Sequence, residues 1–215
     1  MKQQSYIPAL AYRSLTGLYD PLVRITTRER RFKAALLPQA RLRAGQQVLD
    51  LACGTATLTI AAKRMQPRAD ITGADGDPDI LTRARVKAAK AEAELKFDES
   101  LSQHLPYADS SFDVVLSSLF FHHLDRENKL ATLSEVWRVL KPGAELHIAD
   151  WGKAANPLMR VLFLIVQMLD GFATTTDNVA GRLPEFLRAS GFKEVEETQR
   201  FSTVLGTLAL YRAKR

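Results

Sequence analysis

Short apolar runs alternate with longer segments of helical pattern through the middle of the chain. Five runs are candidate strands: Gln47–Ala52, Asp70–Ala74, Glu94–Phe97, Phe112–Ser117 and Glu145–Ala149. Several of them are almost continuously apolar, which is typical of strands buried on both faces of a parallel sheet. The alternation of these strands with helices predicts an α/β domain with a doubly wound sheet.

Start and stop signals divide the helical segments from the strands. The pair Asp77–Pro78 offers an N-cap and a first-turn proline to the helix that follows. Asp125 is a second candidate N-cap, for a helix that ends at Leu140. The sequence KPG, residues 141–143, is expected to stop that helix.

The two ends of the chain and one internal segment differ from this pattern. Residues 1–40 are expected to form helices before the domain, and the β-rich stretches Lys193–Thr198 and Val204–Arg212 suit a closing antiparallel pair. The most apolar segment, Leu158–Leu169, predicts a helix that is too short to span a bilayer. It is therefore interpreted as a buried helix or a lid.

Composition indicates one ordinary globular domain covering residues 1–215, with 46% hydrophobic and 25% charged residues. The net charge of +6 raises the question of acidic partners. The positive residues are scattered, which disfavours nucleic acid and leaves peripheral membrane contact open. A single cysteine, Cys53, and an N-terminus without a signal-peptide core predict a cytoplasmic location.

The stretch VLDLACGTATL, residues 48–58, reads as a strand, a turn of small residues and the start of a helix. This arrangement makes half of a nucleotide-binding unit. Asp50 places a negative charge beside the turn, where it would repel a pyrophosphate. Asp75, at the end of the second strand, can accept hydrogen bonds from both ribose hydroxyls of an adenosine, although a turn or capping role is the alternative.

The charge of Asp50 favours S-adenosylmethionine over NAD as the ligand. S-adenosylmethionine has no phosphate and carries a sulfonium and an ammonium group. Two opposite charges ~4 Å apart attract by about 4 kcal/mol at an effective dielectric of about 20, enough to decide between the two ligands.

Four blocks of sequence then carry a resemblance to a known family. They are VLDLACGTATL, ITGADGDPDIL, LPYADSSFDVVLSSLFFHHL and EVWRVLKPGAELHIAD, in this order. The chain resembles the class I S-adenosylmethionine-dependent methyltransferases, in particular the ubiquinone/menaquinone-biosynthesis-like branch. The resemblance implies a Rossmann-like seven-stranded sheet with an antiparallel last strand, and S-adenosylmethionine as cofactor with S-adenosylhomocysteine as product.

The resemblance also implies where the cofactor is bound. Its methionine end would lie along the loop after the first strand, its ribose at Asp75, its adenine near Ile80 and its ammonium near the backbone of Ser117. The implied residues are Tyr19, Asp50, Ala52, Cys53, Gly54, Thr55, Ala56, Asp75, Gly76, Ile80, Leu101, Ser102 and Ser117.

Two features depart from the family pattern. Ala52 and Ala56 stand where glycines are usual, and alanine fits there if its φ angle is negative. Leu101 stands where an acid often binds the adenine amine, with Asp98, Glu99 or Ser102 as possible substitutes.

The FFHHL stretch follows the fourth strand and should border the reaction centre. His123 or His122 can act as general base if the acceptor must lose a proton, and hydrogen bonding within the loop is an equal alternative. Neighbouring side chains of an extended segment point apart, so the two histidines are not expected to share one role. No metal-ligand spacing is recognisable, so no metal is predicted.

The segment after the fifth strand is expected to cover the acceptor, with residues 152–183 as a substrate cap and 1–40 as a helical lid. Trp151, Phe163, Met168 and Phe172 are the candidate acceptor contacts, although one face of such a helix is usually core. These residues favour a small apolar or amphipathic acceptor: a quinone precursor, a lipid or a thiol. The alternatives are a noncatalytic nucleoside- or RNA-binding protein and an NAD-dependent oxidoreductase. The acceptor atom and the oligomeric state stay open.

Overall fold

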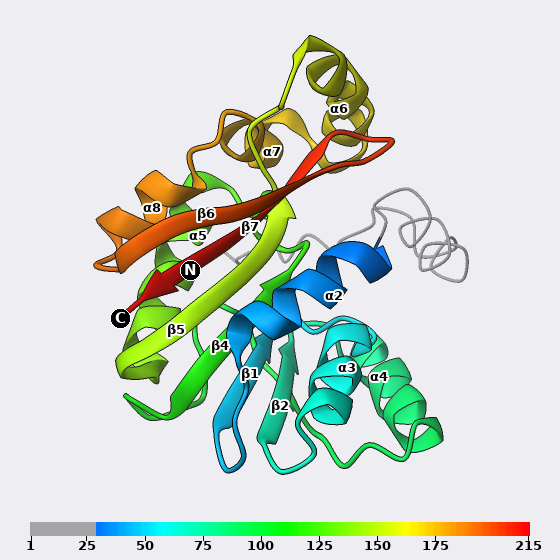
Figure 1. Cartoon of the computed structure of the whole chain (residues 1–215), viewed down its shortest axis with the longest axis vertical. Helices are drawn as coiled ribbons and strands as arrows, with labels where there is room; N and C mark the ends of the chain where they lie inside the picture. Colours follow the sequence, from blue (N-terminus) through cyan, green and yellow to red (C-terminus); the bar gives the residue numbers. More distant parts are fainter. Residues whose placement is uncertain (1–28) are drawn as a thin grey trace, which may run out of the picture.

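The computed structural model describes residues 29–215, which contain a seven-stranded sheet with helices on both faces (Figure 1). The strands are β1 (Gln47–Leu51), β2 (Asp70–Asp75), β3 (Lys96–Glu99), β4 (Phe112–Ser118), β5 (Leu140–Trp151), β6 (Lys193–Ser202) and β7 (Thr207–Lys214). Their order is β3-β2-β1-β4-β5-β7-β6, and β7 runs antiparallel to both of its neighbours. The predicted doubly wound sheet with an antiparallel last strand is confirmed.

The helices are α2 (Glu29–Ala40), α3 (Thr57–Met65), α4 (Pro78–Lys90), α5 (Arg126–Val139), α6 (Pro157–Asp170), α7 (Phe172–Val179) and α8 (Leu183–Ala189), with a 3₁₀ turn, η2 (Phe121–His123). Side chains of α2 and α3 share one core cluster with the sheet, and α4 packs beside α3. Side chains of α5 and α8 form the core on the opposite face. Two layers of helices therefore enclose the central strands, as their apolar sequences require.

The predicted helix starts are confirmed, and α5 ends within one residue of its predicted end, although at a strand and not at a turn. Asp77 caps α4 by accepting from two backbone N–H groups, and Asp125 caps α5 in the same way through one. However, α5 ends at Val139, and the KPG residues 141–143 belong to β5. Leu140 already has extended backbone and pairs with Phe112 of β4, so the sheet takes up the residues that were expected to form a turn.

The strand order β3-β2-β1-β4-β5 changes direction at β1, which pairs with β2 on one side and with β4 on the other. In such sheets ligands bind beyond the carboxyl ends of the strands. The helices α6 and α7 lie beyond the carboxyl end of β5, on this same side (Figure 1). Among residues 29–215, no helix is long and apolar enough to cross a membrane.

Candidate active site

Asp50, at the carboxyl end of β1, has one carboxylate oxygen bonded and one without a partner. Its Oδ2 accepts a hydrogen bond from the Thr59 hydroxyl at 2.6 Å. Its Oδ1 is buried and has no hydrogen-bond partner among the described residues. Burial raises the pKa of Asp50 to about 6. A buried acceptor normally has a partner, so this oxygen is available to a cationic or hydrogen-bonding ligand.

The loop after β1 has left-handed backbone at Ala52 (φ 54°), Gly54 (φ 55°) and Ala56 (φ 61°). The condition of negative φ, under which alanine would fit here without strain, is met at neither position. This conformation costs an alanine roughly 1–2 kcal/mol. The loop is held in it by hydrogen bonds from Cys53 N to Ala74 O and from Ala56 N to Cys53 O, each 3.0 Å long. Ala56 offers α3 no side-chain cap.

Asp75, at the end of β2, fastens this loop to the second strand. Its Oδ2 accepts from Gly54 N at 2.9 Å and its Oδ1 from Asp77 N at 3.1 Å. Each oxygen keeps a further lone pair for a ligand. Asp77 performs the capping of α4, so Asp75 is not needed for that role. Gly76 follows Asp75 directly, Ile80 lies in the first turn of α4, and both residues are partly buried.

The two sides of this loop differ in how closely they are packed. A Cβ added to Gly54 would meet nothing within 4 Å, whereas a Cβ on Gly73 would lie 2.9 Å from the Cys53 sulfur. Gly54 therefore borders open space, and Cys53 packs beneath the loop. Burial raises the pKa of the Cys53 thiol far above its usual range, so this thiol is not a nucleophile at neutral pH. Thr55 accepts a hydrogen bond from the Lys87 ammonium at 3.3 Å.

The remaining cofactor candidates differ in their exposure and in their hydrogen bonds. Leu101 is 41% exposed, and the Ser102 hydroxyl lies 2.8 Å from that of Thr132, inside the protein. Ser117 lies within β4 rather than after it, and its hydroxyl donates to the Leu51 carbonyl at 3.2 Å. Tyr19 lies outside the described residues.

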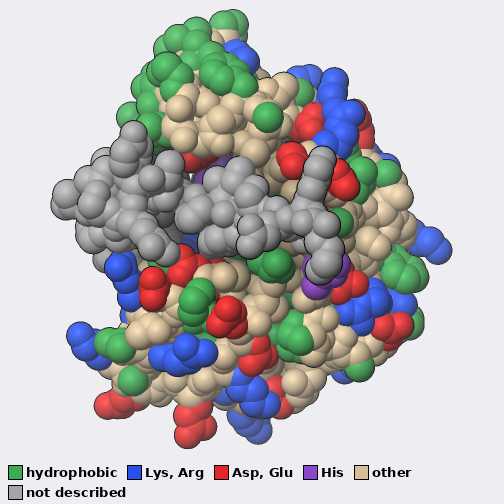
Figure 2. Space-filling view, turned by 180° about the vertical axis from the view of Figure 1, so that it is seen from behind, with side chains coloured by type: hydrophobic (Ala, Val, Ile, Leu, Met, Phe, Trp, Pro, Cys, Tyr) green, Lys and Arg blue, Asp and Glu red, His purple; other side chains and the backbone are tan. Residues whose placement is uncertain are grey.

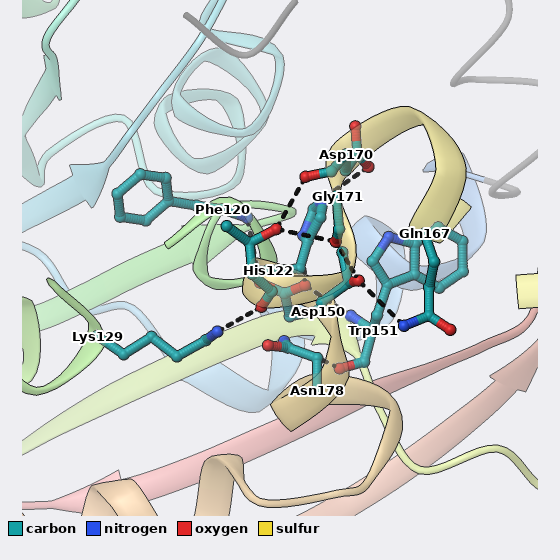
Figure 3. Close-up of polar contacts among 11 residues, drawn as sticks. Phe120, His122, Lys129, Asp150, Trp151, Gln167, Asp170, Gly171 and Asn178 are labelled. Carbon is teal, nitrogen blue, oxygen red and sulfur yellow. Dashed lines mark hydrogen bonds and ion pairs between the residues drawn. The ribbon is translucent and has the colours of Figure 1, made fainter. Parts of the chain in front are cut away.

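On the acceptor side, His122 and Asp150 form a buried pair (Figure 3). His122 Nδ1 is 2.7 Å from Asp150 Oδ1. The same carboxylate accepts from the backbone N–H groups of Phe120, His122 and Trp151, at 3.1, 3.3 and 2.7 Å. Burial opposes ionisation of Asp150, but the charge and hydrogen bond of His122 hold its pKa below the usual range. Because an ionised carboxylate only accepts, Nδ1 of His122 carries the proton of this hydrogen bond.

The second nitrogen of His122 faces Asp170, the last residue of α6. His122 Nε2 and Asp170 Oδ2 are 3.7 Å apart, too far for a hydrogen bond. Burial raises the pKa of Asp170. The sequence reasoning missed Asp170, although a single acid at the end of an otherwise apolar helix is a signal that could have identified it. Nε2 is the ring nitrogen that does not contact Asp150, so a proton given to the ring would be taken up there.

His123 lies against His122, with ring centroids 4.0 Å apart. The expectation that the two side chains point apart was wrong, because η2 is a 3₁₀ turn and not an extended segment. Burial, together with the neighbouring His122, lowers the pKa of His123 to about 3. The ligand-type atoms of His122, His123 and Asp170 lie within 4.8 Å of one another, a grouping that their sequence spacing did not reveal.

The four predicted acceptor contacts are not gathered in one place. Trp151 and Phe163 are buried against each other, with ring centroids 5.3 Å apart. Met168 and Phe172 are 70% and 53% exposed. Burial therefore divides the four predicted contacts into one buried pair and two exposed residues.

The strand order, the carboxylates of Asp50 and Asp75 towards the carboxyl ends of β1 and β2, and the buried pair of His122 and Asp150 are together typical of a class I methyltransferase. The model of a methyltransferase domain matches residues 48–143. A demethylmenaquinone methyltransferase of Deinococcus radiodurans is 30% identical over 209 residues, covering 94% of this chain and 85% of the relative. One of Thermus thermophilus is 32% identical over 178 residues, covering 80% of each.

A solved structure agrees in fold. A SAM-dependent methyltransferase from Aquifex aeolicus superposes with a TM-score of 0.64 at 19% identity, covering 85% of this chain and 88% of that one. The chain belongs to the S-adenosylmethionine-dependent methyltransferases of the ubiquinone/menaquinone-biosynthesis branch. The predicted enzyme class and cofactor are confirmed, and a small-molecule acceptor agrees with this family. The noncatalytic and NAD-dependent alternatives are not supported.

Proposed function

We propose that this enzyme methylates a small apolar acceptor of the quinone-precursor type. The observation that carries the proposal is the His122–Asp150 pair, a base and its orienting acid at the carboxyl edge of the sheet. It lies beneath α6, whose sequence is apolar apart from Arg160, Gln167 and Asp170. The relatives that are named demethylmenaquinone methyltransferases support an acceptor of this kind.

On the cofactor side, the unpartnered oxygen of Asp50 would attract the positively charged methionine end of S-adenosylmethionine. Asp75 would accept from the ribose hydroxyls with the lone pairs that Gly54 and Asp77 leave free. When bound, the cofactor supplies a methyl group on a sulfonium. We retain Leu101, on the exposed side, as the candidate neighbour of the adenine, and Tyr19 as a candidate closing residue.

On the acceptor side, His122 would act as the general base. A base is required when the attacking atom must lose a proton, as a quinol does. The proton would move to Nε2, and the positive charge that develops on the ring would be stabilised by Asp150. His123, stacked on this ring and held neutral by burial, is assigned to positioning.

Residues 152–183 would form the cap over the acceptor. Two side chains attach α7 to neighbouring elements (Figure 3). Lys129 Nζ donates to the carbonyls of Leu124 and Thr174, each at 2.6 Å, and Asn178 Nδ2 donates to Trp151 O at 3.2 Å. The turn η2 thus carries the base, β5 supplies Asp150, and the cap would supply Asp170. An apolar acceptor would be met at a membrane surface, so we also propose cytoplasmic location with peripheral membrane contact.

The test is methyl transfer from labelled S-adenosylmethionine to a panel of acceptors. The panel contains a demethylated naphthoquinol with a short prenyl chain, a phospholipid, a hydrophobic thiol and an RNA. Label is expected in the naphthoquinol, at a rate that saturates with its concentration. Label in RNA alone, or in none of the apolar compounds, would contradict the proposal.

A further inference from the structure

The outer face of α6 is an apolar ridge exposed to solvent. Its large hydrophobic side chains are 37% to 77% exposed: Leu158, Val161, Leu164, Ile165, Met168 and Leu169, followed by Phe172 at the start of α7. Figure 2 shows hydrophobic side chains gathered at one end of the molecule, and Figure 1 places α6 at that end. Contiguous apolar patches of this kind on a monomer usually mark an interaction site.

The fold does not need this ridge for its own core. The inner face of α6 already supplies Phe163, Val166 and Gln167, all buried, and Phe163 packs on Trp151. The exposed positions Leu158, Val161, Ile165 and Met168 recur every three or four residues and so share the opposite side of the helix. The helix therefore has two apolar faces, of which the described residues 29–215 bury one.

We propose that the α6 ridge docks on the surface of an anionic lipid bilayer, with the helix lying in the plane of the interface. The helix has 14 residues. At ~1.5 Å per residue it is about 21 Å long, less than the ~30 Å of the hydrocarbon core, so it can lie in the surface but cannot cross it.

Charge complementarity selects this occupant. The charged residues of α6 are Arg160, which is exposed, and Asp170, which faces His122. Lys153, just before the helix, is also exposed, and the whole chain carries a net charge of +6. Anionic headgroups attract such a surface, whereas a second copy of the chain would bring together two positive molecules.

Docking of the α6 ridge would bring the proposed active site close to the membrane. This step of the inference rests on the proposed function. Asp170 ends α6 on the side of the base, while Leu169 beside it is 77% exposed on the ridge. A docked α6 would thus hold the base one helix away from the layer in which an apolar acceptor dissolves. Acceptor would then pass from lipid to site without crossing bulk water.

The experiment is vesicle flotation of the full chain, with vesicles of phosphatidylcholine alone and mixed with phosphatidylglycerol. The test variant is Leu158→Glu combined with Val161→Glu on the ridge. The matched control is Met65→Glu combined with Val86→Glu, two exposed apolar residues on α3 and α4 that make the same change in charge. Methyl transfer is measured in parallel with a short-chain naphthoquinol in water and a long-chain one in vesicles.

We expect the wild type and the control to float with the anionic vesicles, and the ridge variant to lose roughly tenfold or more in partitioning. The ridge variant should keep its rate on the short-chain acceptor and lose it on the long-chain acceptor. Equal flotation of all three proteins would overturn the inference, as would a concentration-dependent dimer that the ridge variant abolishes, without vesicle binding. Flotation without transfer to either acceptor would leave the docking standing and refute the proposed acceptor.

Discussion

The role of the buried pair leads to the most specific prediction. In Asp150→Asn the carboxylate becomes an amide with one acceptor oxygen, facing the four donors that now bond to Asp150: the His122 ring and the N–H groups of Phe120, His122 and Trp151. The amide no longer stabilises a positive ring and no longer fixes the proton on Nδ1. His122→Asn removes the base itself.

The magnitude follows from the charge pair. The 2.7 Å contact is fully buried, and opposite charges whose centres are ~4 Å apart attract by about 4 kcal/mol at an effective dielectric of about 20. If relaxation and water entry halve this energy, the transition state loses about 2–4 kcal/mol, a fall of roughly 30- to 1,000-fold in the rate of the chemical step. Loss of the base should cost a similar amount, since general bases typically contribute about 10²- to 10⁴-fold.

The assay is single-turnover methyl transfer with S-adenosylmethionine bound in advance, so that product release does not hide the chemical step. Calorimetry should show cofactor affinity within about threefold of wild type for both variants, since the pair serves the acceptor. The double variant should be no slower than the worse single variant, because the two residues act as one unit. A folded His122→Asn protein with a wild-type single-turnover rate would refute the reasoning. Melting curves separate loss of rate from loss of fold.

Three further predictions concern the cofactor loop and the histidine cluster. Because the pKa of Asp50 is about 6 and a cationic ligand prefers its ionised form, affinity for S-adenosylmethionine, measured by calorimetry, should fall by up to about tenfold per pH unit below pH 6. Ala52→Gly and Ala56→Gly should each stabilise the protein by about 0.5–1 kcal/mol in urea unfolding, because glycine relieves the left-handed strain. Chelation with EDTA should leave turnover unchanged, since proton transfer by His122 needs no metal, and added Zn²⁺ should inhibit by occupying the cluster with His123.

Each of these has a control and a contradicting result. Asp50→Asn should give a flat pH profile of affinity, and an equally steep profile in that variant would assign the titration to another group. Ala62→Gly, in the interior of α3, should destabilise by about 1 kcal/mol; a similar loss at Ala52 would mean that the loop does not store strain. If EDTA abolishes turnover and Zn²⁺ restores it, the cluster is a functional metal centre.

The sheet and the cofactor carboxylates were predictable because their signals are local. Apolar runs mark strands buried on both faces, and Asp77 is the N-cap of α4, which begins at the next residue. Asp50 and Asp75 each end a strand, so the topology alone brings them to one edge of the sheet.

The acceptor side was less predictable because its geometry depends on the tertiary structure. The stacking of His122 on His123 requires a 3₁₀ turn, for which the FFHHL sequence has no distinct signal. Asp170 reaches His122 only because α6 folds back over the end of β5. The positive φ of Ala52 could not be read from its residue type, since alanine normally avoids that conformation.

The most direct test of the proposed cofactor site is calorimetric titration of S-adenosylmethionine into the wild type, into Asp75→Asn and into Asp77→Asn, which removes a neighbouring negative charge and keeps the N-cap oxygen of α4. The account predicts saturable binding to the wild type, weakened at least about tenfold by Asp75→Asn, where a carboxylate that would hold the ribose is lost, and much less by Asp77→Asn. Equal affinity in the wild type and Asp75→Asn would contradict the proposed cofactor site.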